Sequence, residues 1–125
     1  MHFIIGGAYQ GKRDYAKSRF GIKEEEIKTC TEDGEIRFDA PCIDRIEEFV
    51  LRCVKNGEDP TELFRRNREK WKDSVLICRD LFCGVVPMGA EMRAWREAAG
   101  RLCAYLASEA EGVTRMFCGL ETRLK

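Results

Sequence analysis

Short apolar runs of the kind that form buried β-strands occur at several places along the chain. Clear examples cover residues 2–5, 74–78 and 113–118. The segment 35–41 is a weaker candidate for a further strand. Stretches that favour helices separate these runs, so the pattern predicts strands that alternate with helices.

Helix signals fill the intervals between these runs. They predict helices over residues 12–20, from Pro41 to about Asn56, from Pro60 onward, and within 89–110. Gly21 and Gly57 are placed to end the first two, and Asp59 is placed to cap the third. The longest helix carries one apolar stripe, made of Met92, Trp95, Ala99, Leu102, Leu106 and Ala110. The charged segments 22–35 and 61–71 are expected to lie on the surface.

This alternation predicts an α/β fold with a small, mostly parallel sheet flanked by helices. The 125 residues suit one domain over the whole range 1–125. Twenty-two basic residues balance twenty-two acidic ones, which gives no electrostatic signature of nucleic-acid binding. No apolar run approaches a membrane span and no signal-peptide pattern opens the sequence, so we expect a cytoplasmic protein without a membrane partner.

The seven cysteines are expected to be reduced side chains of the core. Their number is odd and no C-x-x-C pair occurs, which argues against a disulfide framework or a zinc site. Most of them lie on apolar stripes or in strand-like runs, where cysteine behaves as a small hydrophobic residue. The one histidine, His2, has no neighbouring nucleophile or metal ligand and is given no role.

The first candidate for chemistry is the segment GGAYQGKR, which follows the first predicted strand. It matches the phosphate-binding pattern G-x-x-x-x-G-K-[ST] up to its last letter. The nucleotide-binding residues would be Gly6, Gly7, Ala8, Tyr9, Gln10, Gly11, Lys12 and Arg13. A strand before the loop and a helix after it supply backbone N–H groups for phosphate, and Lys12 adds a charge. A glycine-rich turn with a surface lysine is the alternative.

A phosphate-binding loop usually works with a carboxylate at the end of a nearby strand, which helps to hold magnesium. Asp80 follows the run 74–78 and is the first candidate for that metal ligand. Asp39 follows the weaker run 36–38 and is the second, although a surface turn would explain it equally well.

Arg13 departs from the pattern, because that position ordinarily supplies a hydroxyl to the magnesium ion. Two like charges about 4 Å apart repel each other by several kcal/mol at an intermediate dielectric. Arg13 therefore either turns away from the site or replaces the ion, and a role for Mg²⁺ stays open.

Further motifs in residues 74–125 resemble the adenosylcobinamide kinase / adenosylcobinamide-phosphate guanylyltransferase family, as does the N-terminal IIGGAYQGK. The matches occur in the family's order and spacing. They are Gly84-Val85-Val86-Pro87, then Arg93, Trp95, Arg96, Glu97, Gly100 and Arg101, then Ala107, Ala110, Glu111 and Val113, then Gly119, Leu120, Leu124 and Lys125. Arg13, Arg79, Asp80 and Phe82 depart from the family's residues at their positions.

The resemblance implies a P-loop NTPase-like fold and a homo-oligomer, typically a trimer. It implies transfer of the γ-phosphoryl group of ATP or GTP to the hydroxyl of adenosylcobinamide, with Lys12 and Asp80 as catalytic residues. Arg93 and Arg96 lie one helical turn apart and would face a phosphate, or else form surface pairs such as Arg93 with Glu97. The family's guanylate-accepting histidine has no counterpart after residue 3.

Two other classes of function stay open at this stage. The altered residues Arg13, Arg79 and Phe82 favour a non-catalytic protein that binds a nucleotide or a corrinoid, with a regulatory role. A scaffold subunit that has lost the site is the third class, and the intact Lys12 argues against it.

Overall fold

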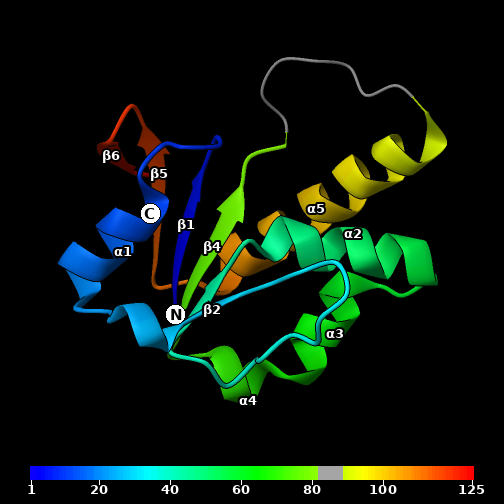
Figure 1. Ribbon diagram of the computed structural model, residues 1–125, viewed down its shortest axis with the longest axis horizontal. Coiled ribbons are helices and arrows are strands. Elements are labelled where there is room, and N and C mark those ends of the chain that lie inside the picture. Colours follow the sequence, from blue (N-terminus) through cyan, green and yellow to red (C-terminus); the bar gives the residue numbers. More distant parts are fainter. Residues whose placement is uncertain (82–88) are drawn as a thin grey trace.

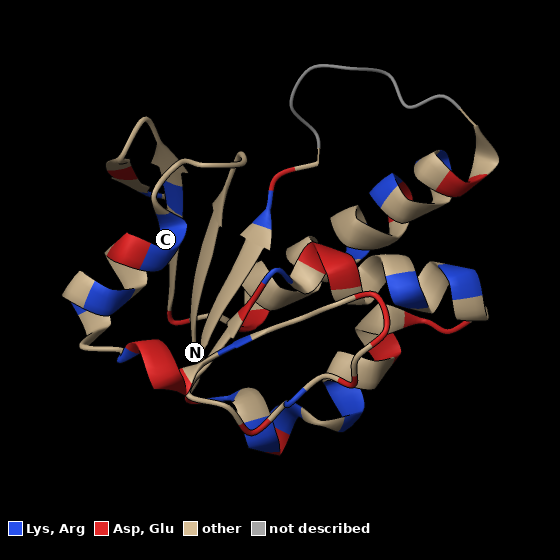
Figure 2. Ribbon diagram, viewed as in Figure 1, with Lys and Arg blue, Asp and Glu red and all other residues tan. Residues whose placement is uncertain are grey.

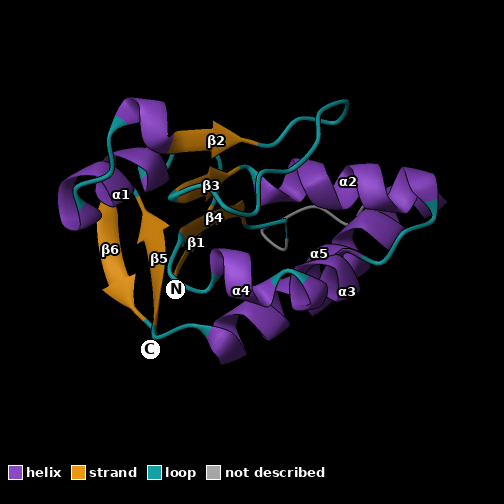
Figure 3. Ribbon diagram, turned by 90° about the horizontal axis from the view of Figure 1, so that it is seen from below, coloured by secondary structure: helices purple, strands orange, loops and turns teal. Residues whose placement is uncertain are grey.

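A six-stranded sheet forms the centre of the protein and carries helices on both faces (Figures 1 and 3). The computed structural model describes residues 1–81 and 89–125. The predictions that concern Phe82, Cys83 and residues 84–87 lie outside the described residues. The strand order is β2-β3-β4-β1-β5-β6, so the first strand lies inside the sheet.

Five of the strands are parallel, and only β6 runs antiparallel, beside β5. The predicted α/β fold with a mostly parallel sheet is therefore confirmed. The strands are β1 (His2–Gly6), β2 (Ile27–Thr29), β3 (Cys42–Asp44), β4 (Val75–Arg79), β5 (Gly112–Phe117) and β6 (Leu120–Arg123).

The helices follow the predicted order. They are α1 (Lys12–Phe20), a 3-10 turn η1 (Glu24–Glu26), α2 (Ile46–Asn56), α3 (Pro60–Arg66), α4 (Arg68–Trp71) and α5 (Ala90–Glu109). Gly21 and Gly57 end α1 and α2 in the left-handed conformation, with φ of 65° and 69°. Asp59 caps α3 by accepting hydrogen bonds from the N–H groups of Thr61 and Glu62. These predicted helix boundaries are confirmed.

The segment around Pro41 differs from the prediction. Residues 35–41 form no strand, and residues 42–44 form β3 instead of the first turn of a helix. Pro41 accepts a hydrogen bond from the Val75 N–H at the start of β4. Cys42 and Ile43 are both fully buried, one on each face of the sheet. Two consecutive apolar residues show neither the period of a strand nor that of a helix, so the sequence alone could not distinguish the two.

The segment 22–35 was expected to lie on the surface, but it contains β2, and its Ile27 and Cys30 are buried in the core.

Three further expectations also need correction. Phe64 and Trp71 lie in the core, within the segment 61–71 that was expected to be exposed. Their rings pack against each other, with centroids 5.9 Å apart, and the Trp71 indole donates to the Phe64 carbonyl. Met92, the first residue of the apolar stripe on α5, is 42% exposed. The last strand was expected at residues 113–118, but a further strand, β6, follows it; its four residues are all exposed and so lack the alternation that identifies a strand.

Two apolar layers enclose the sheet. Ile4, Val75 and Ile77 face α1, whereas Phe3 and Leu76 face the layer formed by α2 to α5. The alternation follows from the strand geometry, in which successive side chains point to opposite faces. Figure 2 shows acidic and basic residues mixed along α1, α2, α3 and α5, whereas η1 is acidic only. In the described parts of the chain, no helix is both long and apolar enough to cross a membrane.

Five cysteines lie in these layers and confirm the core role expected of them: Cys30, Cys42, Cys53, Cys78 and Cys103. Burial raises the pKa of the Cys30, Cys42 and Cys53 thiols to about 12, so they stay protonated at neutral pH. Cys118 is exposed. Among the described residues, no cluster of histidine, cysteine and carboxylate side chains could hold a metal ion.

The sheet explains why β1 ends in glycine. A Cβ atom at Gly6 would lie 2.6 Å from the Met116 carbonyl oxygen on β5, whereas a Cβ at Gly7 would meet only the Gln10 side chain at 3.5 Å. We predict that Gly6→Ala lowers the free energy of unfolding by about 1–3 kcal/mol, because a backbone atom must move. Gly7→Ala should change it by less than about 0.5 kcal/mol. Urea denaturation compares the two, and equal effects would contradict the close packing of β1 on β5.

Candidate functional site at the carboxyl edge of the sheet

Residues 7–11 form a tight loop between β1 and α1. Tyr9 and Gly11 both have left-handed backbones, with φ of 59° and 86°. The N–H groups in the first turn of a helix have no partner within the helix. In α1 they also receive no side-chain cap, because the preceding residue is Gly11. Lys12 folds back over the loop and donates from Nζ to the Gly7 carbonyl, at 2.6 Å. The loop thus presents N–H groups and one ammonium toward the edge of the sheet.

The loop lies where the chain changes from one face of the sheet to the other. After β1 the chain enters α1 on one face, and after the neighbouring strands β3 and β4 it enters α2 and α5 on the opposite face (Figure 3). Such a change between adjacent strands leaves a crevice beyond their carboxyl ends, which is where open α/β sheets bind ligands. The Asp80 N–H donates to the Gly6 carbonyl at 2.7 Å and fixes β4 beside the loop.

A cavity of about 640 Å³ opens at this crevice. The loop and α1 form one wall, and the ends of β3 and β4 with the start of α2 form the other. Five basic side chains and three acidic ones line it: Lys12, Arg13, Lys17, Arg45 and Arg79, with Asp14, Asp44 and Glu47. The basic side chains exceed the acidic ones by two, so the cavity favours an anion.

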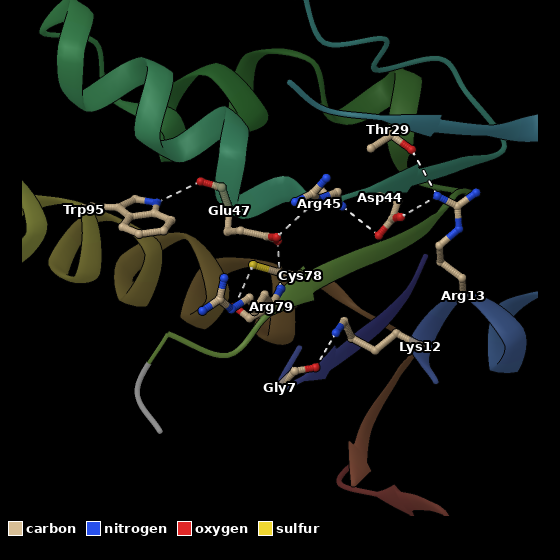
Figure 4. Close-up of polar contacts among 10 residues, drawn as sticks. All are labelled: Gly7, Lys12, Arg13, Thr29, Asp44, Arg45, Glu47, Cys78, Arg79 and Trp95. Atoms are coloured by element: carbon tan, nitrogen blue, oxygen red, sulfur yellow. Dashed lines mark hydrogen bonds and ion pairs between the residues drawn. The ribbon is translucent and has the colours of Figure 1, made fainter. Parts of the chain in front are cut away.

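Asp44 is the buried carboxylate closest to the altered end of the loop. Its Oδ2 lies 3.1 Å from Nη1 of Arg13, and its Oδ1 accepts a hydrogen bond from the Arg45 N–H at 2.8 Å (Figure 4). Only 5% of the Asp44 side chain is exposed, compared with 38% of Arg13. Arg13 also contacts Glu24 at 2.6 Å and the Thr29 hydroxyl at 3.3 Å. The guanidinium therefore joins α1 to three other elements.

Glu47 is a second buried carboxylate of the cavity. Its Oε1 accepts a hydrogen bond from the Arg79 N–H at 2.9 Å, which connects the start of α2 to the end of β4. The Glu47 carbonyl accepts a hydrogen bond from the Trp95 indole at 2.8 Å, which holds α5 against α2 (Figure 4). The position of Glu47 is thus set by two other elements.

Lys12 shares the field of both carboxylates. Burial lowers the pKa of its ammonium, and the negative charges of Glu47 and Asp44 act against this shift. When neighbouring carboxylates offset only part of the cost of burying a cation, a bound anion stabilises its charged form. Lys12 is therefore suited to contact phosphate oxygens.

The structure brings together only part of the predicted site. The loop residues from Ala8 to Arg13 line the cavity, and Asp80 follows β4 next to the loop, but Asp80 is not one of the described residues that line the cavity. The carboxylate that contacts Arg13 is Asp44, which sequence reasoning missed because it placed residues 42–44 in a helix. The signal was present, since an aspartate follows the two apolar residues Cys42 and Ile43.

Asp39 was chosen as a metal ligand because a strand was expected at residues 36–38, and that strand does not form. Asp39 lies before β3, and its neighbours Ala40 and Pro41 accept hydrogen bonds from residues at the start of β4. Asp39 is thus at the amino edge of the parallel strands, where its carboxylate is exposed and pairs with Arg37 at 3.4 Å.

Arg93 and Arg96 lie in the first two turns of α5, and neither lines the cavity. Arg93 is exposed. Within the described part of the chain, Arg93 and Glu97 do not form the surface ion pair that their spacing would allow. The geometry of these residues therefore favours neither interpretation of the two arginines.

Comparison with known sequences found no protein-family model that matches the chain and no curated protein that matches it. The interpretation of the cavity therefore depends on its own residues and on the motif resemblance described above.

The contact between Arg13 and Asp44 should be the strongest ion pair of the cavity. We predict a coupling free energy of about 1–3 kcal/mol in a double-mutant cycle of Arg13→Ala and Asp44→Ala, because one partner is buried. A parallel cycle with Glu24→Ala should give a smaller value that decreases with salt, because Glu24 is exposed and screened. Urea denaturation at two salt concentrations measures both. Equal coupling in the two cycles would contradict the geometry.

Proposed function

We propose that the protein binds a purine nucleoside triphosphate, ATP or GTP, with its phosphate chain in the cavity at residues 7–13. The main support is the loop itself, because a G-x-x-x-x-G-K segment joins an inner parallel strand to a helix at the crevice of the sheet. The excess of basic side chains around the cavity also supports a polyanionic ligand. The purine base follows from the family resemblance alone.

In this proposal the fold is of the P-loop NTPase type. The N–H groups of the loop and of the first turn of α1 would contact the β- and γ-phosphates, and Lys12 would exchange its bond with the Gly7 carbonyl for bonds to phosphate oxygens. Arg79 and Arg45, on the opposite wall, would neutralise the remaining charge.

The proposed reaction is transfer of the γ-phosphoryl group to the hydroxyl of adenosylcobinamide, as the resemblance implies. The hydroxyl oxygen would form a bond to the γ-phosphorus while the bond from that phosphorus to the bridging oxygen breaks. Asp80 would accept the proton of the hydroxyl, and Arg93 and Arg96 would hold the acceptor. We do not propose guanylyl transfer, because the sole histidine, His2, lies at the start of β1 and bonds to Thr114.

Binding of a nucleotide or corrinoid without turnover is the second candidate. The ion pair of Arg13 with Asp44 favours it, because Arg13 already neutralises the buried carboxylate at the end of β3. Incubation with ATP, magnesium and adenosylcobinamide separates the two, since only a kinase forms the phosphorylated corrinoid.

The proposed role of Lys12 is tested by Lys12→Ala, which should weaken nucleotide binding at least tenfold, or about 1.4 kcal/mol. Lys72→Ala is the control, because it removes the same charge at a residue that does not line this cavity. Isothermal titration calorimetry measures both affinities, and circular dichroism checks that the variants fold. Unchanged affinity in a folded Lys12→Ala protein would remove the proposed phosphate site.

A further inference from the structure

We propose that Arg13 is the resident cation of the phosphate site, so that the cavity binds the metal-free nucleotide and does not need magnesium. The guanidinium would neutralise both Asp44 and the phosphate chain. This inference rests on the nucleotide binding proposed above, and it adds the form of the ligand, a nucleoside polyphosphate without its divalent cation.

Two groups hold magnesium in P-loop proteins. These are the hydroxyl of the residue after the loop lysine and a carboxylate near the end of a strand. The residue after the loop lysine is here Arg13, and the buried carboxylate it meets at the end of β3 is Asp44. The two side chains bind each other, with Nη1 and Oδ2 3.1 Å apart. A magnesium site does not fit these residues.

Asp44 has no carboxylate oxygen left without a donor to which a metal ion could bind. Both carboxylate oxygens already accept from donors, Oδ2 from Arg13 and Oδ1 from the Arg45 N–H. Magnesium would have to approach one of them to about 2.1 Å. At that distance from Oδ2 it would meet the positive charge of Arg13, which repels it.

Arg13 is held in place by its neighbours and still has guanidinium N–H groups that could bind a ligand. Its guanidinium contacts Thr29 on β2, Glu24 on η1 and Asp44 on β3. These three elements, together with α1, fix its position. These contacts use three of the five N–H donors of a guanidinium. The side chain also lines the cavity, and 38% of it is exposed. A phosphate oxygen can therefore bind Arg13 without breaking its contact with Asp44.

The test compares the affinity of the wild type for ATP in excess magnesium and in EDTA, by isothermal titration calorimetry. We expect the two dissociation constants to agree within about threefold. This comparison needs no substitution, so it holds even where a variant is unstable.

Arg13→Ser restores the hydroxyl and frees Asp44. Its ATP binding should become at least tenfold tighter in magnesium than in EDTA, and magnesium alone should raise its melting temperature. The matched control is Lys17→Ser, which removes the same charge from α1 and the same cavity but leaves the pair of Arg13 and Asp44 intact. That variant should bind ATP more weakly than the wild type, and equally in both conditions.

The outcomes separate this inference from the proposed function. If the wild type and Arg13→Ser both bind ATP only in the presence of magnesium, Arg13 is not the resident cation, although the proposed nucleotide binding is supported. A wild type that binds no ATP in either condition overturns both. Magnesium dependence that appears equally in Lys17→Ser and Arg13→Ser assigns the effect to net charge and also overturns the role of Arg13.

Discussion

The placement of β1 inside the sheet is the constraint on which the other features depend. Because β1 bonds to β4 on one side and β5 on the other, and both faces are covered, the strand offers almost no position for a polar side chain. Polar groups that could contact a ligand are therefore found only beyond the end of the strand. At that end Gly6 packs against the Met116 backbone, and the chain turns into α1 through a loop whose residues from Ala8 onward line the cavity.

The charges around this loop follow from the burial of two carboxylates. Asp44 is the last residue of β3 and Glu47 lies in the first turn of α2. A buried carboxylate is stable only with donors and a nearby cation. Backbone N–H groups of Arg45 and Arg79 supply the donors, and Arg13 supplies the cation for Asp44. The same arrangement therefore determines which cations a bound polyphosphate would meet in the cavity.

Much of the fold could be predicted because its signals are local. The glycine ends of α1 and α2, the Asp59 cap and the continuous apolar runs of β1 and β4 each act over a few residues. Three strands escaped prediction. β2 lies within a charged segment, β3 has three residues that are all buried, and β6 is exposed throughout. The glycine loop was visible as a motif. The partner of Arg13 was not, since Asp44 lies 31 residues further along the chain and meets it only through the sheet.

The central claim is that a nucleotide phosphate chain lies against residues 7–13. The most direct measurement is a nuclear magnetic resonance titration of isotopically labelled protein with ATP, which follows every backbone amide. We predict that the largest shifts occur at the amides of residues 7–13 and at the guanidinium of Arg13. Shifts confined to the opposite edge of the sheet, around Lys72 and Glu109, or no shifts at all, would contradict it.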